Sequence, residues 1–123
     1  MNMSDDVSAE SFESEVRLRG YSYTTASVSG NIAFIIENYP ILYGRNAGKQ
    51  ISIGIVLPKD YPSAAPAGVH IKWRQDLQNK PASIVNSDMG NGWERMSRAV
   101  QSWIPGRRRA ELFFAQVDRW LET

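Results

Sequence analysis

The strongest constraint on the fold is a proline-rich segment that separates two stretches of alternating residues. In residues 51–57 every second residue is a large aliphatic one, and residues 69–73 repeat the alternation of apolar and polar residues. A period of two is typical of a β-strand with one buried face. Residues 58–66 carry three prolines, which can continue neither a helix nor a central strand. The sequence therefore predicts two strands joined by an ordered bend.

The remaining patterns add two strands before this pair and helices after it. Residues 18–28 and 32–36 contain many residues that favour extended backbone, and residues 29–31 between them have turn chemistry, which predicts a β-hairpin. Two apolar sets recur at helical spacing: Trp93, Met96, Val100 and Trp103, and Phe113, Val117, Trp120 and Leu121 within a final helix from about Arg109 to Leu121. We therefore predict an α+β domain with a four-stranded antiparallel meander, C-terminal helices on one side of it, and an N-terminal helix that is short or absent.

Gly54 and His70 lie on the second face of the predicted strand pair, opposite the large aliphatic residues. Gly54 has no side chain to pack, which suggests close approach of another stretch of backbone, or a bulge. His70 is expected to be a half-exposed strand residue rather than a catalytic base, because no acidic residue lies two positions away to orient it.

The N-terminal segment differs in charge from the rest of the chain. Residues 1–16 hold five acidic residues and no lysine or arginine. Since the whole chain has 13 acidic and 14 basic residues, residues 17–123 carry a formal charge of about +6. We expect residues 1–17 to form an acidic, flexible arm and residues 18–123 to form a single domain, with docking of the arm on a basic surface as the alternative.

Composition excludes several classes of chemistry. The chain has no cysteine and one histidine, so disulfides, zinc–thiolate sites and thiol nucleophiles are ruled out, and neither a cofactor nor a metal is expected. No apolar run of about 18 residues exists, and the acidic N-terminus does not resemble a signal peptide. The basic cluster at residues 107–109 lacks interleaved aromatic residues. We expect a cytoplasmic protein that binds neither nucleic acid nor membranes.

The bend carries a family resemblance. Residues 58–62 read Pro-Lys-Asp-Tyr-Pro between two strands, which resembles the Pro-x-x-Tyr-Pro signature of ubiquitin-conjugating enzymes. A closer resemblance, over about residues 18–121, is to the bacterial branch called prokaryotic family E; it rests on residues 34–41, 93–98 and 103–106 and on the Tyr-Pro segment. The resemblance implies a UBC-like fold. It also implies three partners, a ubiquitin-like protein, an activating-enzyme homologue and a deconjugating peptidase from the same operon.

The resemblance also implies where a nucleophile would lie. In the family the catalytic cysteine precedes a Trp-Ser pair by a short spacing, and an asparagine upstream of the cysteine supports the oxyanion. With Met96-Ser97 in place of that pair, the nucleophile position falls on Ser87 or Asp88, and the asparagine position falls on Asn79. A serine there would take the modifier as an oxyester, with Asp88 as a proton acceptor and the Asn79 amide as an oxyanion donor.

Several alternatives stay open at this point. Ser83 is the second choice of nucleophile. Ser87 and Asp88 could instead form only a turn, or Ser87 could be an engineered replacement for cysteine. Family members read Trp-Ser-Arg-His where residues 96–99 read Met-Ser-Arg-Ala, which leaves two positions without their usual residues. The chain could therefore be a conjugating enzyme, an inactive adaptor that binds a ubiquitin-like protein or its activating enzyme, or an unrelated interaction domain.

Overall fold

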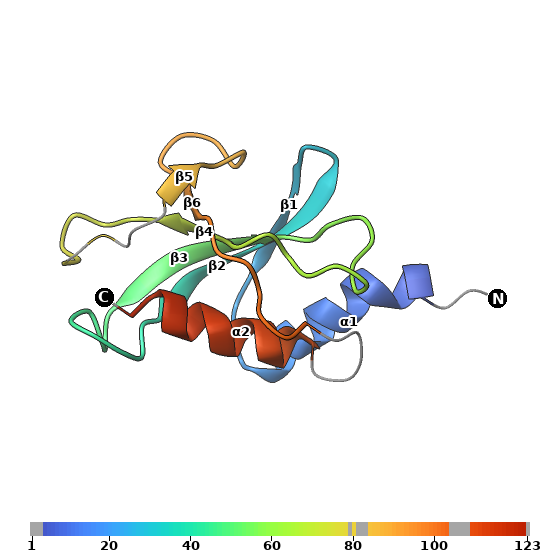
Figure 1. The fold of residues 1–123 in the computed structure, drawn as a ribbon, viewed down its shortest axis with the longest axis horizontal. Coiled ribbons are helices and arrows are strands. Elements are labelled where there is room, and N and C mark those ends of the chain that lie inside the picture. The colour runs from blue at the N-terminus through green and yellow to red at the C-terminus, as the bar shows by residue number, and fades with distance from the viewer. Residues whose placement is uncertain (1–3, 79, 81–83, 104–108, 123) are drawn as a thin grey trace.

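The computed structural model describes residues 4–78, 80, 84–103 and 109–122 and contains both helices and strands. In chain order the elements are α1 (Ser4–Leu18), β1 (Thr24–Val28), β2 (Asn31–Pro40), β3 (Gln50–Val56), β4 (Val69–Lys72), β5 (Ile84–Asn86), β6 (Glu94–Met96) and α2 (Arg109–Trp120). The strands form one sheet in the order β1-β2-β3-β4-β6-β5, and every neighbouring pair is antiparallel (Figure 1). The α+β class is therefore confirmed.

The first four strands form the predicted meander, but the sheet has six strands rather than four. The helical spacing that begins at Trp93 gave a wrong prediction, because residues 94–96 form β6 and pair with β4 on one side and β5 on the other. The free edge of β4 explains this outcome, since a strand edge presents unpaired backbone groups that a neighbouring segment can satisfy. Pairing with β4 thus overrides the local helical pattern.

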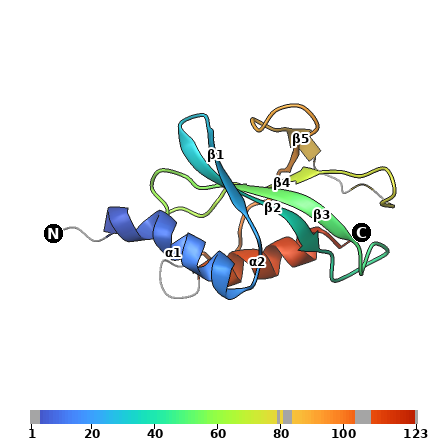
Figure 2. The ribbon, with the colours of Figure 1, turned by 180° about the vertical axis from the view of Figure 1, so that it is seen from behind.

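Both described helices lie on the same side of the sheet, as Figure 1 and the reverse view in Figure 2 show. The predicted short or absent N-terminal helix is wrong, because α1 has 15 residues. Phe12 and Val16, four positions apart on one helix face, are both fully buried in the core. The sequence signal was weak because these two residues stand among acidic and polar ones. The side chains of residues 1–9 lie outside the described part of the structure. For these residues the flexible arm stays a prediction, and so does the domain boundary after residue 17.

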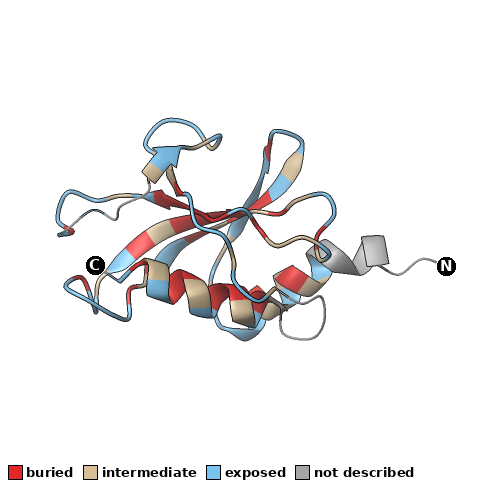
Figure 3. Cartoon of the chain, viewed as in Figure 1, coloured by how far each residue is buried: buried red, intermediate tan, exposed pale blue. Residues whose placement is uncertain are grey.

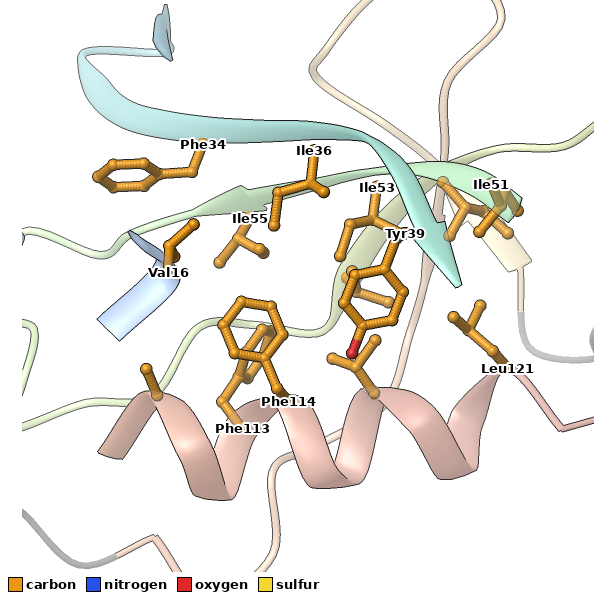
Figure 4. Close-up of a cluster of buried hydrophobic side chains, with 14 of the residues drawn as sticks. Val16, Phe34, Ile36, Tyr39, Ile51, Ile53, Ile55, Phe113, Phe114 and Leu121 are labelled. Carbon is orange, nitrogen blue, oxygen red and sulfur yellow. The ribbon is translucent and has the colours of Figure 1, made fainter. Parts of the chain in front are cut away.

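The core lies between the sheet and the helices, where the buried residues of Figure 3 gather. Ile51, Ile53, Ile55 and Leu57 are all at most 3% exposed, which confirms the predicted buried face of β3. Figure 4 shows β2 and β3 side chains pointing toward Phe113, Phe114 and Leu121 at the C-terminal end of the chain. The predicted final helix is confirmed as α2, and three of its four predicted core residues are buried; Trp120 packs against the core from a partly exposed position.

The proline-rich bend is an ordered part of this core, as predicted. Tyr61 is 4% exposed, and its ring centroid lies 5.7 Å from that of Phe12 in α1 and 5.9 Å from that of Trp103. The indole N–H of Trp103 donates a hydrogen bond to the carbonyl oxygen of Pro62 over 2.9 Å. The bend therefore ties α1 and the segment after β6 to the sheet at the connection between β3 and β4.

Candidate functional site

The sheet face opposite the helices carries a row of three residues from three strands. In the antiparallel register Gly54 of β3 lies opposite His70 of β4, and His70 lies opposite Arg95 of β6. Directly opposed residues point to the same face of a sheet. Because the neighbouring residues Ile53 and Ile71 are buried in the core, Gly54, His70 and Arg95 face the other way.

The β5–β6 hairpin brings a serine onto this row. Ser87 follows β5 directly, and its Oγ atom lies 2.7 Å from Nδ1 of His70. The N–H of Met89 donates a second hydrogen bond to the same Oγ over 3.0 Å, so residues 87–89 also form a serine turn. Ser87 thus combines the turn role considered from the sequence with a contact to the single histidine of the chain.

His70 differs from its predicted state. Its side chain is 7% exposed and therefore buried, so the prediction of a half-exposed strand residue is wrong. The error has a clear cause, since the connection between β5 and β6 lies over this face, where Ser87 contacts His70 and the Met89 side chain lies over Gly54. The contact with Ser87 leaves no local signal in the sequence, because the two residues are 17 positions apart.

The surroundings of His70 favour its neutral form. Burial and, to a smaller extent, the positive charge of Arg95 lower the pKa of His70, and the negative charge of Asp88 partly opposes them, so that the pKa is about 4. At neutral pH the imidazole is therefore uncharged and has one nitrogen free to accept a proton. Because Ser87 Oγ already accepts the N–H of Met89, its own hydrogen is available for Nδ1 of His70. This arrangement favours the tautomer that carries its proton on Nε2.

A cavity of about 300 Å³ adjoins the Ser87–His70 pair. It lies between the β1–β2 turn and the β5–β6 hairpin, which both rise on the side of the sheet away from the helices (Figure 1). Its polar lining includes His70, Asn86, Asp88 and Arg95. Asn31, across the cavity, has a side-chain oxygen that is buried and makes no hydrogen bond. The cavity therefore offers both hydrogen-bond donors and acceptors to a ligand that reaches the pair.

The residues implied by the family resemblance have different outcomes. The structure brings Ser87 and Asp88 beside His70, and Asp88 lines the cavity. Asn79 and Ser83 lie outside the described residues. Arg95, which sequence reasoning did not select, has no carboxylate within ion-pair distance among the described residues, and its guanidinium donates to the carbonyl oxygen of Ala67 over 3.1 Å.

Among the described residues no group of three or more histidine, aspartate or glutamate side chains is placed to hold a metal ion. No helix within those residues has the length and apolar character needed to cross a membrane.

The chain matches the model of a known protein family. The model of the family described as prokaryotic E2 family E matches residues 10–123. No curated protein and no solved structure matches the chain. The matched range includes every strand of the sheet, the serine turn and α2, and it begins inside α1.

Proposed function

Since the chain belongs to prokaryotic E2 family E, we propose that it accepts the C-terminus of a ubiquitin-like protein from an activating enzyme, with Ser87 as the acceptor. Membership of this family supports a ubiquitin-conjugating-like role and interaction with a ubiquitin-like protein and an activating enzyme in general. The proposal goes further in assigning the acceptor atom to a serine, in a chain that contains no cysteine.

One observation carries the assignment, the 2.7 Å contact between Ser87 Oγ and His70 Nδ1. A serine hydroxyl is a weak nucleophile at neutral pH and needs a base within hydrogen-bond reach. His70 meets both the distance and the protonation requirement, because its pKa of about 4 keeps it neutral. Asp88, the proton acceptor suggested by the sequence, instead lines the cavity and supplies a negative charge near His70.

The proposed step is an exchange of a thioester for an oxyester. Ser87 Oγ attacks the thioester carbonyl carbon of the modifier while its proton moves to Nδ1 of His70. When the tetrahedral intermediate collapses, the carbon–sulfur bond breaks and His70 returns the proton to the departing thiolate. Because burial and Arg95 disfavour the charged imidazole, the proton resides on His70 only during the transfer. The products are the Ser87 oxyester and the free thiol of the activating enzyme.

The adaptor alternative is favoured by a different contact. The hydrogen bond from the Met89 N–H to Ser87 Oγ is the kind that a serine makes when it only stabilises a turn. In that case the fold binds a ubiquitin-like protein or its activating enzyme without forming a covalent intermediate. The two functions share their partners and differ in the adduct.

The test is adduct formation with the activating-enzyme homologue, the ubiquitin-like protein and Mg-ATP, followed by intact mass. We expect an adduct that resists thiol, is cleaved by mild hydroxide, and is absent from Ser87→Ala. Ser97→Ala is the matched control, because Ser97 is exposed and lies outside the serine turn. Retained binding with no adduct in the wild-type protein would establish the adaptor function instead.

A further inference from the structure

The open face of β3 has a gap at Gly54 that a neighbouring side chain fills. A Cβ atom built on Gly54 would lie 2.6 Å from Cε of Met89 and 3.4 Å from Cζ3 of Trp93. Any residue other than glycine would therefore displace the end of the Met89 side chain. A close approach does occur at Gly54, but two side chains make it, so the predicted approach of backbone is wrong.

Met89 is joined to the serine turn at its other end. Its main-chain N–H donates to Ser87 Oγ, and that oxygen contacts His70. The gap filled by Met89 lies opposite His70 in the pairing of β3 with β4. The side chain of Met89 thus reaches from the turn to the strand position beside the histidine.

The far end of the same connection is also held on the sheet. The Lys72 ammonium group lies 5.4 Å from the ring centroid of Trp93, and Trp93 is the second side chain over Gly54. A cation over an indole ring is attracted to its face. Residues 87–93 are therefore anchored at both ends, by Met89 near the serine and by Trp93 near β6.

We infer that Met89 is a positioning residue, which fills the gap over Gly54 and thereby holds the serine turn in contact with His70. This inference rests on the proposed function only where it takes the Ser87–His70 contact to activate the serine. Methionine suits the task because its flexible thioether can follow an irregular space. Loss of the anchor lets the turn separate from β4, so that water reaches His70 and the Ser87–His70 distance lengthens.

The first readout is titration of His70 by NMR, which needs no partner protein and is unambiguous because the chain has one histidine. In the wild-type protein we expect a pKa of about 4. Both Met89→Ala and Gly54→Ala should move the pKa of His70 toward its ordinary value of 6.5, because burial is the main cause of the shift. The Gly54→Ala protein should stay folded, since a flexible side-chain end is all that must move.

Two further variants separate positioning from a general loss of stability. Met89→Leu keeps an apolar side chain of similar volume and should retain the low pKa of His70. In the double variant Gly54→Ala/Met89→Ala the pKa of His70 should equal that in either single variant, because the two changes remove the same contact between position 54 and the Met89 side chain. Ser52→Ala is the control, because Ser52 lies two positions from Gly54 on the same strand face and its hydroxyl donates to the carbonyl oxygen of Glu37 rather than to the serine turn.

The second readout is the rate of adduct formation at Ser87, which should fall about ten- to a hundredfold in Met89→Ala and recover in Met89→Leu. A His70 pKa that stays at about 4 in both single variants would overturn the inference. Absence of any adduct in the wild-type protein would overturn the proposed function and leave the NMR result to decide the role of Met89.

Discussion

The hydroxyl group of Tyr39 donates a hydrogen bond to Oδ1 of Asp118 over 2.5 Å, which joins β2 to α2 inside the core. Tyr39 is fully buried and Asp118 is 8% exposed. Burial raises the pKa of the Asp118 carboxyl above its ordinary value, while the Tyr39 hydrogen bond and the charge of Arg19 act in the opposite direction. The hydrogen bond therefore offsets part of the free-energy cost of burying the Asp118 carboxylate.

Tyr39→Phe removes this donor and keeps the ring. We expect the free energy of unfolding at pH 7 to fall by about 1–3 kcal/mol, because a buried acceptor is left without its partner. Loss of the hydrogen bond raises the pKa of Asp118 further, so the destabilisation should shrink as the pH falls and the folded carboxyl takes up a proton.

Urea unfolding at pH 7 and at about pH 4 measures both effects. Tyr43→Phe is the control, since Tyr43 is 41% exposed and should change little. A destabilisation by Tyr39→Phe that is equal at the two pH values would show that Asp118 is not the group affected.

The second prediction concerns α1. Phe12 is fully buried, and its ring packs against Phe34 at a centroid distance of 5.2 Å and against Tyr61 at 5.7 Å. Phe12→Ala should therefore destabilise the domain by about 3–5 kcal/mol. Leu18→Ala, at the exposed end of the same helix, should change stability by no more than about 0.5 kcal/mol. Similar unfolding curves for the two variants would mean that α1 contributes nothing to the core.

The third prediction concerns His70 and acid stability. Its folded pKa of about 4 lies below the ordinary value of 6.5, so between these values the unfolded chain binds the proton more readily. Stability from this group is present above pH 6.5 and is lost as the pH falls through 4. The loss amounts to about 3 kcal/mol at most.

This contribution is measured as a difference between two proteins. Carboxylates titrate in both the wild-type protein and His70→Gln, so subtracting their pH-stability curves leaves the part due to the histidine. The wild-type curve should fall more steeply between pH 6.5 and 4. Parallel curves would show that His70 is as readily protonated in the folded protein as in the unfolded chain.

The strongest sequence patterns located most of the sheet. Alternation over residues 51–57 gave the buried face of β3, and the three prolines after it gave the bend, because both depend on local backbone preferences. The strands β5 and β6 have three residues each, too few to show a period. These strands form because β6 pairs with the free edge of β4 and β5 pairs with β6, and a local sequence pattern does not indicate such pairing.

Only part of the candidate site was predicted, because its geometry also depends on strand pairing. The family resemblance points to Ser87, whereas the sequence around His70 does not indicate a base, because no acidic residue lies two positions away along the strand. The pairing of strands brings the two residues together. β6 pairs with β4 on one side and with β5 on the other, so the serine turn that joins β5 to β6 lies beside His70. The fit of Met89 over Gly54 depends on the same pairing, and only the presence of a glycine within a strand indicated it.

The most direct test of the central claim is to locate the bond that the modifier forms. The wild-type adduct is digested at low pH, where oxyesters survive, and the modified peptide is sequenced by mass spectrometry. We predict that the modifier remnant lies on Ser87 and that His70→Gln slows its appearance by about a hundredfold or more. A remnant on a lysine, stable to hydroxide and unaffected by His70→Gln, would contradict the assignment of Ser87 as the acceptor.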